Sequence, residues 1–230
     1  MLLSLKTNWG DCALPNFKLI NKMNFQYYRT KPLVIVILVL TGLVNYLLIN
    51  VAAPVANYFS LDGIRLPSSL AIVTLILILY NQYAWKWPLL KLLVKVPNIG
   101  GRYKGEIDFE WEGVSGSKEC VVEIFQTASS IKVCTYYNNG DKEKTSSRSI
   151  VETIKKEDDE FFNIYLFYHN AGTKENGKLD SHEGANVLRY HPATKKNRSK
   201  LIGHYFTNRK IQTRGTIEVE FKSKKLKGKF

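Results

Sequence analysis

Cysteine and histidine are scarce in this sequence, and neither falls in a metal-binding pattern. The three cysteines, Cys12, Cys120 and Cys134, are odd in number and lack C-x-x-C spacing, which argues against a disulfide framework and against a zinc site. We therefore expect reduced thiols. The four histidines show no ligand spacing of the H-x-x-x-H kind. The prediction is a protein without a metal site and without a cofactor.

Catalytic motifs are missing as well. Ser115 and Ser117 have no G-x-S-x-G context, and no other residue pairs a nucleophile with a base. Gly100, Gly101 and Gly105 open an expected strand instead of joining a strand to a helix, so they do not form a phosphate-binding loop. The sequence favours a binding module over an enzyme.

Acidic residues are outnumbered, with 20 Asp and Glu against 33 Lys and Arg and a net charge of +13. The excess is local, because residues 97–221 hold 19 basic and 18 acidic residues, a net charge of +1. The surplus lies beside two apolar runs and in the C-terminal tail. This distribution does not indicate a nucleic-acid polymer as partner, since such a domain would itself be basic. The tail either contacts anionic lipid headgroups or only improves solubility.

Long apolar runs are present near the N-terminus. Residues 33–53 carry no charge, and about 20 helical residues at 1.5 Å each cross a hydrocarbon core of about 30 Å. Residues 66–85 are also uncharged and end among aromatic residues typical of a membrane interface. We expect two transmembrane helices, and the alternative for each run is a buried core helix. Basic residues before the first run and after the second predict that both termini face the cytoplasm.

After Pro97 the pattern becomes an alternation of apolar and polar residues, which is typical of strands with one buried face. About eight such segments follow, separated by turn-rich pieces. No helical period appears between them, so we expect an antiparallel sheet that closes into an up-and-down barrel; a β-sandwich is the alternative. The expected strands lie at 103–111, 118–127, 130–138, 147–155, 161–169, 184–190, 200–209 and 214–222.

These patterns predict five parts of the chain. They are an N-terminal cytoplasmic segment (1–30), two transmembrane helices (31–87, with spans 33–53 and 66–85), a basic stem (88–100), a ligand-binding β-barrel (101–222) and a basic tail (223–230).

The segment near the end of the chain carries the chemistry of a binding site. Tyr205, Thr207 and Arg209 alternate along one expected strand and so share a face. If that face points inward, the ring can stack on a nucleobase and the guanidinium can bind a phosphate. The alternative is that Tyr205 belongs to the core and Arg209 is solvated at the strand end.

Several features together resemble one family. Two membrane spans, a basic stem, the opening GRYKGEI (101–107) and the closing GHYFTNR (203–209) with TRGTI (213–217) resemble the SMODS-associated, two-transmembrane, β-strand-rich effectors of bacterial CBASS antiphage defence. The resemblance implies a minimal β-barrel that binds a cyclic di- or trinucleotide made by a partner nucleotidyltransferase. It also implies self-association and disruption of the bacterial inner membrane. The residues it assigns to the ligand are Tyr103, Trp111, Tyr205, Thr207, Asn208, Arg209, Thr213 and Arg214.

Two other functions remain open at this point. A membrane-tethered carrier of lipids would have a barrel lined by aliphatic side chains, and an assembly protein would have a filled barrel. A phosphorylated ligand instead requires inward polar groups such as Thr207 and Arg209.

Overall fold

The computed structural model describes residues 25–59, 66–138, 144–172 and 180–230, which fall into two compact units. One unit holds the apolar helices up to Pro97 together with Thr127–Ser130, and the other holds Asn98–Gln126 and Ile131–Phe230. Most of the predicted N-terminal segment, 1–30, lies outside the described residues. The predicted stem and tail boundaries stay predictions.

One long apolar helix follows the N-terminal segment. It runs from α1 (Thr30–Leu47) through a π-helical turn, η2 (Leu48–Ala52), into α2 (Ala53–Tyr58). Pro54 explains the turn, because its ring would clash with the carbonyl of Asn50 in a regular α-helix, and the wider turn relieves that clash. The helix has 29 residues and is long enough to cross a membrane, and an 18-residue stretch within it has a mean hydropathy of 2.5.

The second predicted span is not supported as a transmembrane helix. α3 covers only Ser69–Gln82, and its 14 residues extend about 21 Å, less than a hydrocarbon core of about 30 Å. Beyond it the chain bends into two 3₁₀ turns, η3 (Ala84–Lys86) and η4 (Leu90–Leu93), with the Tyr80 hydroxyl donating to the Leu90 carbonyl at 2.7 Å. Trp85, one of the aromatic residues that suggested a membrane-interface belt, is instead fully buried in the protein. The described residues contain one helix of spanning length, and the two-helix transmembrane hairpin was wrong in this respect.

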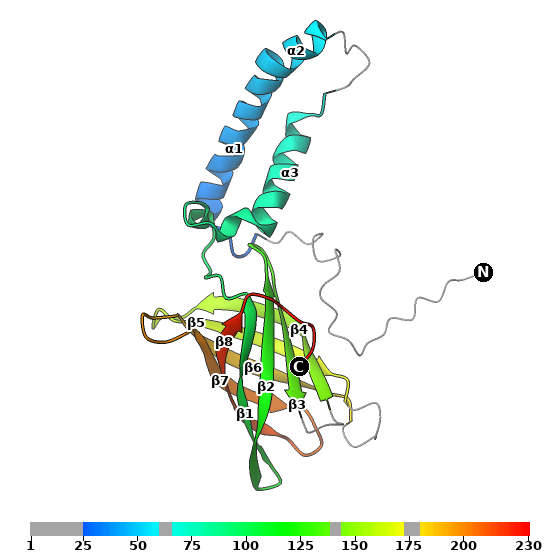
Figure 1. The fold of residues 1–230 in the computed structure, drawn as a ribbon, viewed down its shortest axis with the longest axis vertical. Helices are drawn as coiled ribbons and strands as arrows, with labels where there is room; N and C mark the ends of the chain where they lie inside the picture. Colours follow the sequence, from blue (N-terminus) through cyan, green and yellow to red (C-terminus); the bar gives the residue numbers. More distant parts are fainter. Residues whose placement is uncertain (1–24, 60–65, 139–143, 173–179) are drawn as a thin grey trace, which may run out of the picture. The chain divides into compact units, whose positions relative to one another are not determined.

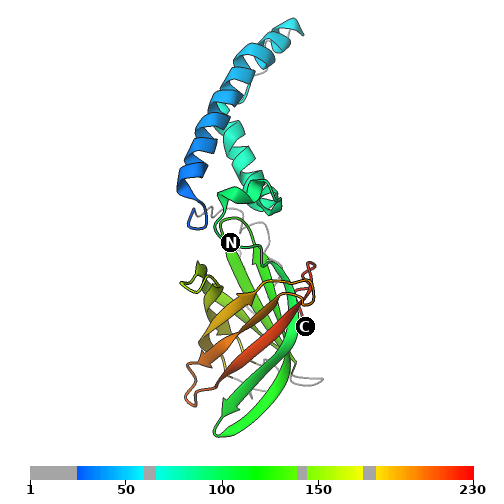
Figure 2. The same cartoon turned by 90° about the vertical axis from the view of Figure 1, so that its left-hand side faces the viewer.

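The strands form a closed barrel in which each strand pairs antiparallel with the next and β8 pairs with β1 (Figures 1 and 2). This confirms the predicted antiparallel barrel of eight strands and excludes the β-sandwich. The strands are β1 (Gly101–Trp111), β2 (Val114–Gln126), β3 (Ile131–Asn138), β4 (Lys144–Lys156), β5 (Phe162–Asn170), β6 (His182–His191), β7 (Lys200–Thr207) and β8 (Arg214–Ser223).

The inside of the barrel is filled in one half. Ile124, Ile164, Leu188 and Leu201 are almost completely buried there, as the alternating pattern requires of inward positions. Tyr103 belongs to the same half: its hydroxyl donates to the Ile99 carbonyl at 2.8 Å. The half of the barrel toward the β1–β2 and β7–β8 connections, here called the hairpin end, is lined by polar and aromatic side chains instead.

The C-terminal tail is docked on the outside of the barrel through a buried ion pair. Glu123 pairs with Arg102, and its carboxylate also accepts the backbone N–H groups of Lys227 at 2.8 Å and Gly228 at 3.0 Å. Arg102 in turn donates to the Lys229 carbonyl at 2.7 Å. The tail is thus held by charge-assisted hydrogen bonds.

Apolar contact completes this attachment. Phe230 packs against Val121 and Tyr136, which are buried although Val121 lies on the outer face of β2. Gly228 has φ +70°, a conformation that favours glycine, so the turn before Phe230 fits its sequence. Neither sequence-based expectation for the tail, headgroup contact or simple solubility, anticipated this docking.

The cysteines differ from one another in state. Cys120 has a free, buried thiol, and burial raises its pKa to about 12, so it is unreactive at neutral pH. Cys134 is disulfide-bonded. The expectation of reduced thiols is therefore wrong for Cys134, because an odd number of cysteines without C-x-x-C spacing does not exclude a single disulfide.

Candidate functional site

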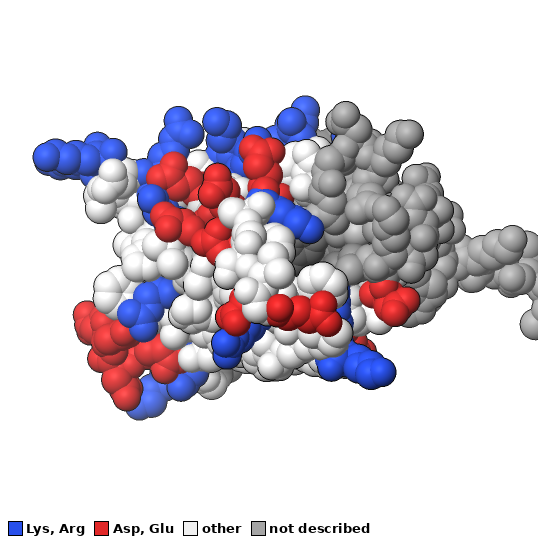
Figure 3. Space-filling model, turned by 90° about the horizontal axis from the view of Figure 1, so that it is seen from below, with Lys and Arg blue, Asp and Glu red and all other residues white. Residues whose placement is uncertain are grey.

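A cavity of about 800 Å³ opens at the hairpin end of the barrel. Five aromatic residues line it, whereas Ile107 and Ile211 are its only aliphatic lining residues among those that the structure describes. Seen from below, the coloured part of the molecular surface carries basic and acidic side chains interspersed, without a large field of one sign (Figure 3). The cavity is therefore a polar and aromatic pocket. Its selectivity for a ligand depends on its lining residues, because the surrounding surface has no strong charge of one sign.

Six of the eight residues assigned to the ligand from the sequence come together in this cavity. They are Trp111, Tyr205, Thr207, Asn208, Arg209 and Thr213. The structure does not bring the other two to it. Tyr103 is packed in the filled half, with its ring edge-on to Phe221. Arg214 is exposed outside the cavity, where its Nε donates to Glu110 Oε2 at 3.1 Å.

The β7–β8 connection is held rigidly by its own polar residues. Thr207 N–H donates to the Thr213 carbonyl, and Thr213 N–H donates to Thr207 Oγ1, both at 3.0 Å. Asn208 N–H donates to the Glu183 carbonyl, and Glu183 N–H donates to Asn208 Oδ1, both at 2.9 Å. Thr207 and Asn208 thus fix the loop that carries Arg209, and Thr213 Oγ1 is buried there without a hydrogen-bond partner among the described residues.

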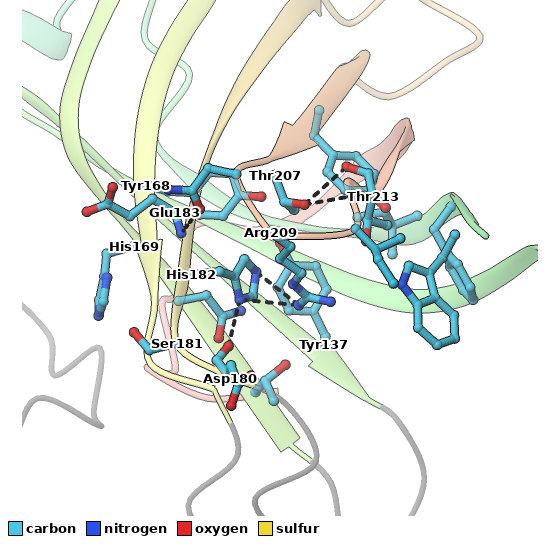
Figure 4. Close-up of a pocket in the computed structure, with 18 of the residues that line it drawn as sticks. Tyr137, Tyr168, His169, Asp180, Ser181, His182, Glu183, Thr207, Arg209 and Thr213 are labelled. Carbon is cyan, nitrogen blue, oxygen red and sulfur yellow. Dashed lines mark hydrogen bonds between the residues drawn. The ribbon is translucent and has the colours of Figure 1, made fainter.

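Arg209 is the main cation of the cavity. Its Nη2 lies 3.2 and 3.1 Å from the two ring nitrogens of His182 (Figure 4). Its Nε is buried and has no hydrogen-bond partner in the part of the chain that the structure describes. Burial lowers the pKa of the guanidinium, but arginine stays charged in proteins. A guanidinium that is held in place and has an unused donor is suited to bind an anion.

Three tyrosines surround this arginine: Tyr137, Tyr168 and Tyr205. Burial raises the pKa of each phenol, that of Tyr137 to about 12, so all three remain neutral donors at physiological pH. Gly184 leaves room for one of them, because a Cβ at this position would overlap the Tyr168 hydroxyl. The cavity therefore combines flat aromatic rings, neutral hydroxyl donors and one arginine.

Sequence reasoning missed several lining residues, among them Tyr137, Tyr168 and His182. His182 was considered only as a metal ligand, and the two tyrosines lie on strands that are distant in sequence from Arg209. Their shared signal is that each occupies an inward position near a strand end at the hairpin end. Only the closed strand order brings these positions opposite the β7–β8 connection.

Comparison with known proteins agrees with this geometry. A family model described as Cap15, cyclic dinucleotide receptor domain, matches residues 94–221, which extend from before β1 into β8. No curated protein matches the chain. The matched region contains the whole cavity and covers more than half of the sequence.

Proposed function

The chain belongs to the Cap15 cyclic dinucleotide receptor family, and from this we propose that it is a membrane-attached effector that binds its ligand in the hairpin-end cavity. Membership confirms the resemblance to CBASS effectors and gives the chain a role in cyclic nucleotide sensing during that defence. The family is one of receptors and not of known enzymes. Ligand binding would then drive self-association, and the apolar helix would damage the inner membrane.

The observation that carries this proposal is the state of Arg209 in the cavity. A cyclic dinucleotide presents phosphodiester anions, flat bases and ribose oxygens. Arg209 Nε and Thr213 Oγ1 are buried polar atoms that lack partners among the described residues, which is the arrangement expected where a ligand supplies them. The rings of Tyr137, Tyr168 and Tyr205 offer faces or edges for bases, and stacking contributes about 1–3 kcal/mol per base.

The cavity also bears on the competing functions. A lipid carrier requires an aliphatic lining, but Ile107 and Ile211 are the only aliphatic lining residues in the described part of the barrel. A protein that uses the barrel only for assembly has no need of a polar cavity of about 800 Å³ beside a filled core. These features favour a phosphorylated, base-containing ligand.

The test is a thermal-unfolding panel on the full chain in detergent. Cyclic dinucleotides built from adenine, guanine and uracil, cyclic trinucleotides and fatty acids are added in separate arms. We expect stabilisation by at least one cyclic dinucleotide, amounting to about 2.7 kcal/mol at 100 times its dissociation constant. Stabilisation by fatty acids alone would support the carrier function instead.

Replacing Arg209 with alanine should weaken binding of that nucleotide by about 1.5–3 kcal/mol, which is roughly 10- to 150-fold in affinity. The reason is the loss of hydrogen bonds to a charged phosphate. Isothermal titration measures the effect. Arg214→Ala is the matched control, because it removes the same charge from an exposed position outside the cavity. Equal affinities for the two variants would place the ligand elsewhere.

We propose that the barrel faces the cytoplasm, where nucleotide second messengers are made. Lys86, Lys91 and Lys95 lie between α3 and β1, and basic residues next to membrane segments favour the cytoplasmic side. A reporter fused after Phe230 should therefore be active only in its cytoplasmic form. A second reporter in the connector between α2 and α3 determines how many times the chain crosses. A periplasmic C-terminus would contradict the assignment.

A further inference from the structure

His182 lies at the start of β6 and meets Arg209 inside the cavity. Its side chain is buried, and its ring is edge-on to Tyr168, with ring centroids 6.5 Å apart. Nδ1 lies 3.0 Å from the Asp180 carbonyl oxygen, which can only accept a hydrogen bond. The proton of the neutral ring is therefore on Nδ1, and Nε2 carries a lone pair.

The contact with Arg209 lies outside the plane of the imidazole ring. Nη2 is 3.2 Å from Nδ1 and 3.1 Å from Nε2, so it is almost equidistant from the two ring nitrogens. A nitrogen in the ring plane at those distances would collide with Cε1, the atom between them. Nη2 therefore lies out of the ring plane, and Figure 4 shows the Arg209 and His182 side chains next to each other in the cavity. A neutral ring tolerates a guanidinium in this place, whereas an imidazolium would be repelled.

Burial, together with the charges around His182, favours the neutral ring. Burial lowers its pKa most, and the charges of Arg209 and His169 lower it further, against the hydrogen bond to Asp180, which raises it. Glu183 follows it in the chain, and the Asp180 side chain, Lys118 and Lys210 line the same cavity. Without a bound anion, Arg209 and His182 repel each other if both are charged.

We propose that His182 becomes protonated when a cyclic dinucleotide binds and so acts as a second anion-binding group beside Arg209. This inference rests on the proposed function of the cavity. A phosphodiester bound to Arg209 comes within reach of the neighbouring imidazole, and its negative charge favours the imidazolium. It also neutralises the repulsion from the guanidinium. The proton is taken from solvent, and binding and protonation then strengthen each other equally.

The direction of the pH dependence follows from this linkage. In the free protein the pKa of His182 lies below its ordinary value, and in the complex it is raised. Affinity therefore increases as pH falls through the pKa of the complex, and it becomes constant below the pKa of the free protein. Each unit by which the ligand raises the pKa corresponds to a tenfold gain in affinity. The phosphodiester does not titrate in this range.

The experiment is isothermal titration of the full chain in detergent with the tightest-binding member of the cyclic dinucleotide panel. Titrations at pH 8 and pH 6 give the affinities, and two buffers of different ionisation enthalpy give the number of protons taken up. We expect tighter binding at pH 6 and proton uptake on binding. His182→Gln should bind with a flat pH profile and no uptake. His204→Gln is the matched control, because His204 is exposed on β7 and does not line the cavity, and it should behave as wild type.

Two results would overturn the inference: binding without proton uptake by the wild-type protein, or equal uptake by His182→Gln. The wild-type measurement in two buffers decides the matter even if His182→Gln fails to fold. Failure of the proposed function looks different, because no cyclic dinucleotide would then give binding heat at any pH.

Discussion

Replacing Glu123 with alanine is expected to lower the free energy of unfolding of the barrel by about 3–5 kcal/mol, the usual range when one partner of a buried ion pair is removed. The variant leaves Arg102 buried without its carboxylate. It also leaves the N–H groups of Lys227 and Gly228 without their acceptor, so the tail loses its attachment. Denaturant unfolding followed by tryptophan fluorescence measures the change.

Glu119→Ala on the same strand is the matched control. Glu119 pairs with Lys104 at 2.9 Å, but both side chains are about half exposed, so the expected loss is below about 1 kcal/mol. The double variant Arg102→Met/Glu123→Leu separates charge from attachment. It removes the uncompensated charge and should recover part of the loss, because apolar replacements of buried ion pairs are often neutral. Similar losses for Glu123→Ala and Glu119→Ala would contradict the structural role of the tail.

The barrel was predictable from the sequence because its signal is local. Alternation such as Tyr103, Ile107 and Trp111 against Lys104 and Asp108 repeats along each strand, and period two identifies a strand without knowledge of its neighbours. The absence of helical segments between the strands then implied hairpin connections and a closed antiparallel sheet. What composition does not give is the division of the interior into a filled and a hollow half, because that depends on how inward residues meet across the barrel.

The second apolar run shows the limit of hydropathy. Residues 66–85 are as apolar as a span, but the helix ends at Gln82 and the following chain turns back, with Trp85 buried. Hydropathy measures the transfer of side chains into an apolar environment and does not distinguish lipid from packed protein. The length of the regular helix, which is a property of the fold, shows that this run is too short to be a transmembrane helix.

The candidate site was predictable from the sequence only where its residues lie close together in the chain. The β7–β8 segment combined a tyrosine, a threonine and an arginine on one strand face, and these residues do line the cavity. Tyr137, Tyr168 and His182 come from other strands, so their proximity to Arg209 requires the strand order and register. Tyr103 and Arg214 were assigned by resemblance alone, and neither lines the cavity.

The proposed membrane damage requires many copies of the chain. Two polar side chains of the long helix are satisfied within it, since Thr41 donates to the Ile37 carbonyl and Asn50 to the Tyr46 carbonyl. The exterior of α1 is apolar, with Ile35 and Leu38 strongly exposed. One such helix can reside in lipid without opening a polar path, because the surface it shows to hydrocarbon is apolar and its backbone groups are satisfied. With Thr41 and Asn50 bonded within the helix, we expect association to come from apolar packing and from the barrels.

Deleting residues 30–58 is consequently expected to abolish ligand-dependent leakage while nucleotide affinity stays within about twofold of wild type, because the cavity lies wholly in the barrel unit. The assay adds cyclic dinucleotide to protein in dye-loaded vesicles and follows release beside the size of crosslinked oligomers. Arg209→Ala with the helix intact is the control, and at ligand concentrations near the wild-type dissociation constant it should assemble and leak much less than the wild type. Leakage caused by a protein that stays monomeric would contradict assembly. Oligomers without leakage would make the chain a scaffold, because the barrels would then associate without transmitting damage to the bilayer.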